Sequence, residues 1–283
     1  MQIIQSYTLT NTQIDEIETL QSLSFLPEGL GNQIFLSSEM NVYKELPCFF
    51  LGYKNDQLVS FLGAFFPSRK EVEFNGFTHP NFRRQLCFTS LCEHALALYK
   101  PYPFTQALFQ RELNSQSGAA FLQKRYPQLD RSEYLMTLEK QHWNTQKRSG
   151  SLELVKTDTK EETINVMSDA FGEDRDESAH VLAYLLSQSN RKTFLYRQDG
   201  KAVGILNALL ENGMWVIHGV GIMHAFRNQG MGSRMFSLAF DILFENASTI
   251  QLEVDSQNLP ALALYRKLGF RTTSQVDYHR LIL

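Results

Sequence analysis

The order of hydrophobic and polar positions in the second half of the chain predicts an alternation of strands and helices. Its apolar runs have the length of strands and are bounded by turn residues. They lie at residues 193–197, 202–210, 215–222 and 249–254. Between the last two runs, residues 230–245 carry apolar side chains at helical spacing, which predicts an amphipathic helix. Asp199-Gly200, between the first two runs, predicts a tight hairpin turn.

The first half of the chain shows the same order of elements. Apolar runs predict strands at residues 48–54, 58–66 and 71–77, and a helical period follows from Leu91 to Leu98. Short motifs also recur at a constant offset of 144 residues. The matched pairs are Phe82 and Phe226, Arg83 and Arg227, Gln85 and Gln229, Asn114 and Asn258, Phe121 and Tyr265, and Tyr126 and Phe270. A constant offset with one order of elements indicates a duplicated domain.

We therefore predict two domains of the α/β class (α+β type), each a mixed, mostly antiparallel sheet flanked by helices. The first domain is expected at residues 1–138 and the second at 151–283. Residues 139–150 are polar and end in Ser149-Gly150, which predicts a linker. The 283 residues are enough for each domain to bury its own core.

The loop at residues 227–232, between a predicted strand and a predicted helix, is the main candidate binding site. Gly230 and Gly232 allow the backbone to take positive φ angles and to approach a ligand closely. The following helix adds unpaired N–H groups and the positive end of its dipole, so the loop suits a phosphate or pyrophosphate. A tight turn without a ligand would use the same residues.

Two motifs in this half resemble those of the GCN5-related N-acetyltransferase (GNAT) superfamily, and the resemblance covers roughly residues 151–283. The coenzyme A loop of that family matches Arg227, Gln229, Gly230 and Gly232. Its later pattern, Asn-x-x-Ala-x-x-Leu-Tyr-x-Lys-x-Gly-Phe, matches Asn258, Ala261, Leu264, Tyr265, Lys267, Gly269 and Phe270.

The resemblance implies where acetyl-coenzyme A binds. The pyrophosphate is expected on the loop amides, the pantetheine arm along the preceding strand, and the tyrosine beside the sulfur as the acid that protonates the departing thiolate. The implied cofactor-binding residues are Val220, Gly221, Ile222, Arg227, Asn228, Gln229, Gly230, Met231, Gly232, Ser233, Asn258 and Tyr265. Asn258 would suit the pantetheine amides, but the favoured role is to cap the helix that follows, because asparagine is a preferred N-cap residue; different atoms of the residue would allow both roles.

Acyl transfer requires a polarised carbonyl, a proton for the leaving sulfur and a base. Backbone N–H groups of residues 220–222 would polarise a thioester if the strand is distorted there, although Gly219 and Gly221 are equally consistent with close helix packing. Tyr265, with an ordinary pKa of about 10, is protonated at neutral pH and could donate a proton to the departing thiolate. The alternative is that it is only a core tyrosine. His218 is the favoured base. The alternatives are Glu211, Glu253, Asp255 or a chain of water molecules.

The first copy lacks several of these groups. Leu86 and Phe88 stand where the second copy has its two loop glycines, and Phe121 replaces the tyrosine. A Cβ atom penalises positive φ, and phenylalanine has no proton to give. We therefore expect this copy to be degenerate and inactive, although a differently shaped loop would restore binding.

Composition excludes several other classes of protein. A net charge of −3 argues against a general nucleic-acid binder, and no apolar run is as long as a membrane span. No signal peptide is visible, so the expected location is the cytoplasm. The three cysteines and seven histidines form no metal motif, so no metal is expected. The predicted function is transfer of an acetyl group from acetyl-coenzyme A to a primary amine of a small molecule or peptide. The alternative is a non-catalytic protein that binds or senses acyl-coenzyme A.

Overall fold

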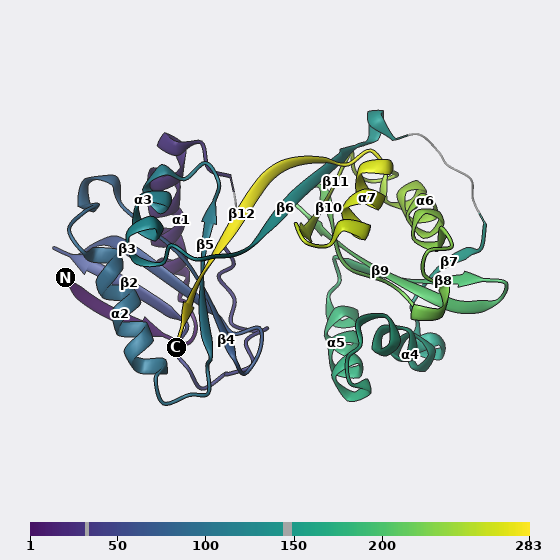
Figure 1. Ribbon diagram of the computed structural model, residues 1–283, viewed down its shortest axis with the longest axis horizontal. Helices are drawn as coiled ribbons and strands as arrows, with labels where there is room; N and C mark the ends of the chain where they lie inside the picture. The colour runs from purple at the N-terminus through teal and green to yellow at the C-terminus, as the bar shows by residue number, and fades with distance from the viewer. Residues whose placement is uncertain (32–33, 144–148) are drawn as a thin grey trace. The chain divides into compact units, whose positions relative to one another are not determined.

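The computed structural model describes residues 1–31, 34–143 and 149–283, which form two compact units (Figure 1). One unit is Met1–Ser132 with Gln275–Leu283, and the other is Glu133–Ser274. Of the predicted linker at 139–150, residues 144–148 lie outside the described residues, whereas Lys140–His142 form a short 3-10 helix, η3.

The elements of the first unit alternate as the hydrophobic pattern predicts. In chain order they are β1 (Gln2–Ser6), α1 (Asn11–Phe25), η1 (Leu26–Glu28), β2 (Phe49–Lys54), β3 (Gln57–Phe65), β4 (Glu71–Thr78), η2 (Pro80–Phe82), α2 (Cys87–Tyr99), β5 (Gln106–Glu112) and α3 (Gln116–Arg125). Strands pair in the order β1-β2-β3-β4-β5-β12, and only β4 and β5 are parallel.

The second unit repeats this plan. Its remaining elements are β7 (Ser151–Leu154), η4 (Thr157–Thr159), α4 (Lys160–Phe171), α5 (Arg175–Ser187), β8 (Arg191–Gln198), β9 (Lys201–Glu211), β10 (Met214–Ile222), η5 (His224–Phe226), α6 (Met231–Leu243), β11 (Thr249–Asp255) and α7 (Leu259–Lys267). The strand order is β6-β11-β10-β9-β8-β7, with one parallel pair, β10 and β11. The predicted α/β fold with mostly antiparallel sheets is confirmed.

Two strands run from one unit into the other: β6 (Leu129–Glu139) and β12 (Arg271–Ile282). The last strand of the second copy pairs with β5 of the first unit, from Val276 to Ile282. The last strand of the first copy pairs with β11 of the second unit, from Glu133 to Glu139. Each copy therefore completes the sheet of the other, and the compact units do not coincide with the predicted ranges 1–138 and 151–283.

Ion pairs hold the exchanged strand in the first unit. The Asp277 carboxylate accepts hydrogen bonds from Arg111 (2.6 Å) and from the hydroxyl of Ser132 (2.7 Å). Burial of Asp277 opposes its ionisation, but the hydrogen bonds from Gln275, Ser132 and Arg111 outweigh this effect and lower the pKa of the carboxyl. Strand β12 thus contributes a negative charge, the Asp277 carboxylate, which Arg111 of the first unit neutralises.

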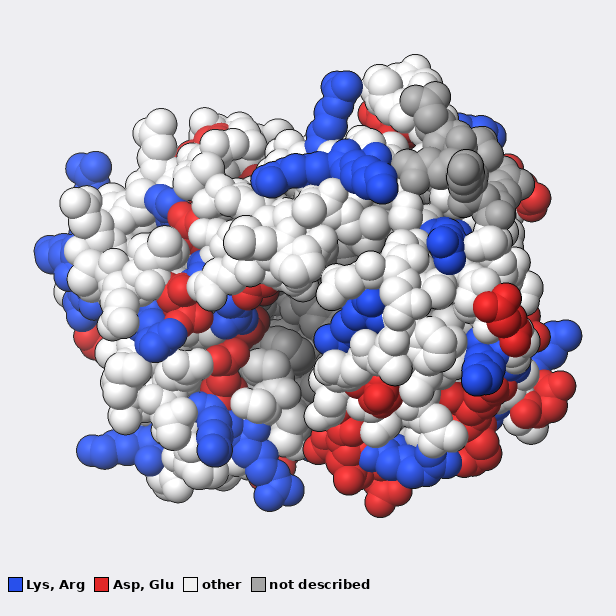
Figure 2. All heavy atoms as spheres, turned by 45° about the vertical axis from the view of Figure 1, so that its right-hand side comes forward, with Lys and Arg blue, Asp and Glu red and all other residues white. Residues whose placement is uncertain are grey.

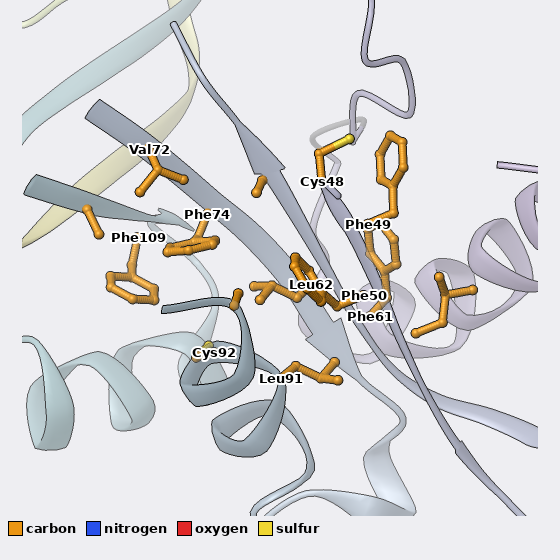
Figure 3. Close-up of a cluster of buried hydrophobic side chains, with 14 of the residues drawn as sticks. Cys48, Phe49, Phe50, Phe61, Leu62, Val72, Phe74, Leu91, Cys92 and Phe109 are labelled. Atoms are coloured by element: carbon orange, nitrogen blue, oxygen red, sulfur yellow. The ribbon is translucent and has the colours of Figure 1, made fainter. Parts of the chain in front are cut away.

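The core of the first unit is rich in phenylalanine (Figure 3). Phe50, Phe61 and Phe74 come from strands, and Leu91 and Cys92 of α2 are buried among them. All three cysteines are free and buried. Burial raises the pKa of the Cys48 thiol to about 11.

The sheet of the second unit has a separate core on each face. In Figure 1, α6 and α7 lie on one side of it and α4 and α5 on the other. Phe236 and Phe240 of α6 pack on the first face, and the ring of Trp143 packs edge-on against Phe240, with 4.8 Å between the ring centroids. Met167 and Leu182 pack on the second. Within the described part of the chain, none of the helices has both the length and the apolar character needed to cross a membrane.

Candidate active site in the second unit

The parallel strands β10 and β11 separate near the middle of the second unit. Their last paired residues are Ile217 and Leu252, yet β10 continues to Ile222 and β11 to Asp255. On its other side, β10 pairs with β9 through a register shift between His218 and Gly221. This shift is a β-bulge of one extra residue, which bends a strand and disrupts its ladder locally. The sheet is therefore opened beside β10.

The two glycines of β10 have different roles. Gly219, in the bulge, has a φ of 56°, a conformation that favours glycine. At Gly221, an added Cβ atom would lie only 2.8 Å from the Cβ atom of Ala170 and 3.0 Å from the ring of Phe171. Both alternatives left open by the sequence are thus present, strand distortion at one glycine and close helix packing at the other.

The loop between η5 and α6 has the shape of an anion-binding turn. Asn228 has a φ of 60° and Gly230 a φ of 75°. Helix α6 starts directly after Gly230, whose missing side chain leaves the first N–H groups without a side-chain cap. No heavy atom lies within 4 Å of a Cβ atom built at Gly230, so the space in front of the loop is open. A pyrophosphate group fits this open, donor-rich turn.

Other loop residues shape the turn instead of facing this space. The Arg227 guanidinium donates to the backbone oxygens of Ile222 (3.0 Å) and Ala170 (2.6 Å), which ties the loop to β10 and α4. Gln229 donates to the backbone oxygen of Ala225 at 3.0 Å. A Cβ atom at Gly232 would lie 3.1 Å from Leu264, so this glycine permits close packing of α6 on α7.

The remaining predicted cofactor-binding residues lie along β10 and the first turn of α6. Val220 and Ile222 belong to the part of β10 beyond its pairing with β11, and Met231 and Ser233 belong to the first turn of α6. Asn258 caps α7, because its Oδ1 accepts a hydrogen bond from the N–H of Ala261 at 3.2 Å.

Tyr265 lies on α7 with its ring packed edge-on against Phe236 (5.6 Å between centroids) and Phe270 (5.9 Å). Its hydroxyl makes no hydrogen bond with any residue in the described ranges. Burial raises the pKa of this phenol to about 12, so it stays protonated at neutral pH. The geometry supplies a proton donor on the same helix that packs against the first turn of α6.

His218 and Glu253 directly follow the last parallel pair, one on each strand, so their side chains project from the same face of the sheet. Both residues expose surface to solvent, yet the surrounding protein is close enough to disfavour their charged forms. Burial and the charge of Arg191 lower the pKa of His218 to about 4. Burial and Glu133 raise the pKa of Glu253. A neutral imidazole is the form that accepts a proton.

The first unit has amides at the equivalent positions. Its parallel pairing ends at Phe74 and Phe109, and the next residues are Asn75 and Gln110. Strands β3 and β4 pair without a register shift, so the bulge is absent as well. Phe121 also replaces the tyrosine. The first unit therefore lacks a titratable side chain at each position equivalent to His218, Glu253 and Tyr265.

The loop of the first unit keeps the backbone shape of the second. Arg83 donates to the backbone oxygens of Thr78 and Ser24, as Arg227 does to its equivalents. Arg84 and Leu86 have φ values of 62° and 60°. The expected penalty of the Leu86 Cβ atom thus does not prevent the left-handed conformation. The leucine side chain is 64% exposed at the start of α2, where the other copy has open space.

The Glu28 carboxylate links the loop of the first unit to the start of α3. It accepts hydrogen bonds from Arg83 (2.6 Å) and from the N–H of Ser117 (3.0 Å) at the start of α3. Burial opposes ionisation of Glu28, but the hydrogen bonds from Ser117 and the charge of Arg83 outweigh it and lower the pKa of the carboxyl. The N–H of Gly31 donates to Glu112 at the end of β5. The segment that follows α1 therefore connects the loop of the first unit with α3 and β5.

Acidic side chains gather on the surface of α4 and α5 (Figure 2). Residues 158–177 contain eight carboxylates and two basic residues, a net charge of −6, whereas the whole chain carries −3. These helices cover the face of the sheet from which His218 projects. A cationic molecule would be attracted to this surface. Among the described residues, no group of His, Cys, Asp and Glu side chains could hold a metal ion.

Comparison with known proteins agrees with the geometry. Residues 159–270 match the model of the acetyltransferase (GNAT) family. A mycothiol acetyltransferase from Clavibacter sepedonicus is 31% identical over 84 residues, a match that spans 29% of this chain and 28% of that protein.

Solved structures resemble the whole chain. A GCN5-related N-acetyltransferase from Sphaerobacter thermophilus superposes with a TM-score of 0.76 at 14% identity, over 99% of this chain and 95% of that one. A tandem GNAT protein from the clavulanic acid biosynthesis pathway gives a TM-score of 0.71 at 13% identity, over 99% and 98% of the two chains. Similarity at this identity concerns the fold.

Proposed function

We propose that the second unit transfers an acetyl group from acetyl-coenzyme A to a primary amine of a small molecule or peptide, because residues 159–270 match the GNAT family model and solved GNAT structures share the fold of the chain. One observation carries the proposal: the open, donor-rich loop at Gly230 lies at the end of the strand that separates from its parallel neighbour. A turn that suits an anion therefore follows, after η5, the same strand that borders the gap.

Acetyl-coenzyme A would supply an activated acetyl thioester. The loop from Asn228 to Gly230 and the first turn of α6 would hold its pyrophosphate. Backbone N–H groups of residues 220–222 would donate to the thioester oxygen as negative charge develops on it. A preorganised donor of this kind contributes about 3 kcal/mol to transition-state stabilisation.

Two side chains would handle the protons. Neutral His218 would accept the proton that the amine loses as its nitrogen bonds to the acetyl carbon. Tyr265 would donate its phenolic proton to the sulfur as the carbon–sulfur bond breaks. Glu253, beside His218 in the opening, is the second candidate for the base.

The acidic surface of α4 and α5 supports an amine as acceptor. Primary amines are mostly protonated at neutral pH, so the net charge of −6 on residues 158–177 would raise their local concentration. Only the uncharged fraction of the amine attacks, and the proton that we assign to His218 is the one lost as the carbon–nitrogen bond forms.

A thiol-release assay with acetyl-coenzyme A and a panel of amines tests the proposal. Release of free coenzyme A that depends on an amine, with formation of the N-acetyl product by mass spectrometry, is the expected result. Tight binding of acetyl-coenzyme A without transfer to any amine, including diamines and amino sugars, would instead favour the alternative of a non-catalytic acyl-coenzyme A binding protein.

A further inference from the structure

Asn207 is a buried polar residue in an otherwise apolar stretch of β9. It is 2% exposed, and it pairs across the ladder with His218. Its Nδ2 donates to the backbone oxygen of Gly219 at 3.3 Å. Gly219 is the residue at which β10 bulges, and an added Cβ atom there would lie 2.9 Å from the same Nδ2. The amide is thus in direct contact with the bulge.

Burying an amide costs free energy unless it gains hydrogen bonds, and Asn207 recovers only part of that cost. Its Oδ1 is fully buried and has no partner among the described residues. An apolar residue would pack at this position without such a loss. The amide is therefore better explained by what it does to Gly219 than by the stability of the core.

The equivalent strands of the first unit, β3 and β4, pair differently and lack this amide. Gly63 occupies the position equivalent to Asn207, because it pairs with the residue that directly follows the last parallel pair. There, β3 and β4 pair from Ser60 to Phe65 with no register shift. The amide and the bulge occur together in the second unit, and both are absent from the first.

We propose that Asn207 is a positioning residue for acyl transfer: by holding the Gly219 carbonyl it fixes the bulge, and the bulge aims the N–H groups of residues 220–222 at the thioester oxygen. This inference rests on the proposed function and assigns a role to a residue that touches neither acetyl-coenzyme A nor the acceptor. The same hydrogen bond fixes the backbone next to His218.

The test replaces Asn207 by leucine, which has a similar size and no donor. We expect N207L to lower kcat about 10- to 100-fold, because the thioester donors are no longer held in place. The dissociation constant of acetyl-coenzyme A, measured by calorimetry, should change less than about 3-fold, because the Gly230 loop holds the pyrophosphate. If N207L does not fold, N207S removes the same amide with a smaller side chain, and the same measurements apply.

The matched control is Thr193→Val. Thr193 is buried, lies across the ladder from Asn207 on β8, and has a hydroxyl without a partner in the described part of the chain. T193V should leave kcat and acetyl-coenzyme A affinity unchanged. If both variants lose activity in proportion to their loss of thermal stability, Asn207 has only a structural role and the inference is refuted.

An infrared measurement separates this inference from the proposed function. With acetyl-coenzyme A labelled with ¹³C at the carbonyl, binding to the wild-type protein should shift the carbonyl stretch to lower frequency, and N207L should lose most of that shift. The measurement needs no acceptor, so it is informative even if no amine is acetylated. An unchanged shift in N207L overturns the role of Asn207, whereas absence of any acetyl-coenzyme A binding by the wild type overturns the proposed function.

Discussion

Gly230→Leu is the sharpest test of the cofactor site, because the first copy of the domain already has a leucine at the equivalent position. In the first copy, Leu86 stands at the equivalent position, and its backbone has a φ of 60°, close to the 75° of Gly230. The variant should therefore fold with the loop intact. Its side chain, however, would enter the open space in front of the loop, where we place the pyrophosphate.

The two expected effects differ in size. A leucine in the left-handed conformation costs about 1–2 kcal/mol of stability, which lowers the unfolding temperature by a few degrees. Loss of two hydrogen bonds from backbone N–H groups to the charged pyrophosphate costs about 3–6 kcal/mol of binding free energy. That loss corresponds to a roughly 10²- to 10⁴-fold weaker affinity for acetyl-coenzyme A.

Titration calorimetry measures the affinity, and Gly213→Leu provides the control. Gly213 has a φ of 77° and, like Gly230, no heavy atom within 4 Å of an added Cβ atom, but it lies in the turn at the opposite end of β10. The backbone penalty should be the same in both variants, and only G230L should lose affinity. Equal affinities for the two variants would show that the pyrophosphate binds elsewhere.

Three further outcomes follow from the site. Tyr265→Phe should lower kcat about 10²- to 10⁴-fold in the thiol-release assay while the calorimetric affinity for acetyl-coenzyme A is retained; an unchanged kcat would make the residue a core tyrosine. His218 has a folded-state pKa of about 4, below its ordinary value of 6.5, so the unfolded chain binds more protons between these values and stability should fall as the pH drops from 6.5 to 4. The variant H218Q should lose less stability than wild type over that range in denaturant titrations, and an identical loss would contradict the lowered pKa. Leu86→Gly should not create a second acetyl-coenzyme A site, because Glu28 still joins Arg83 of this loop to the start of α3, and a stoichiometry of two per chain would show that the leucine alone blocks binding.

Several features of the candidate site in the second unit could be predicted from short stretches of sequence. The glycine at 230 and the asparagine at 258 each act within a few residues of themselves, one by its φ and the other by capping the next turn. Tyr265 belongs to a helix whose spacing is readable from the sequence, and its ring packs against Phe236 of α6. Features of this kind could be predicted because their partners are near in sequence or set by helical period.

Other features depend on partners that are distant in sequence. Glu28 meets Ser117 across 89 residues, and nothing near either residue indicates the contact. The role of Asn207 is not predictable from the sequence, because its partner is a backbone oxygen in a bulge that exists only in the folded sheet; the one local signal is a lone amide in an apolar strand. The alternating pattern of residues 271–283 predicts a strand but fits either sheet equally well, so the exchange could not be predicted.

The exchange of β6 and β12 also bears on why a copy without the loop glycines and the tyrosine persists in the chain. Deleting the first copy would remove residues 133–139 and leave β11, the strand that carries Glu253, with an unpaired edge. Deleting the second would take β12 away from β5 in the same manner. During synthesis, the first unit also has to wait for residues 275–283 before its sheet is complete, so it cannot finish folding ahead of the second. Each half thus supplies a strand that the sheet of the other half needs, so the two copies are retained or lost together.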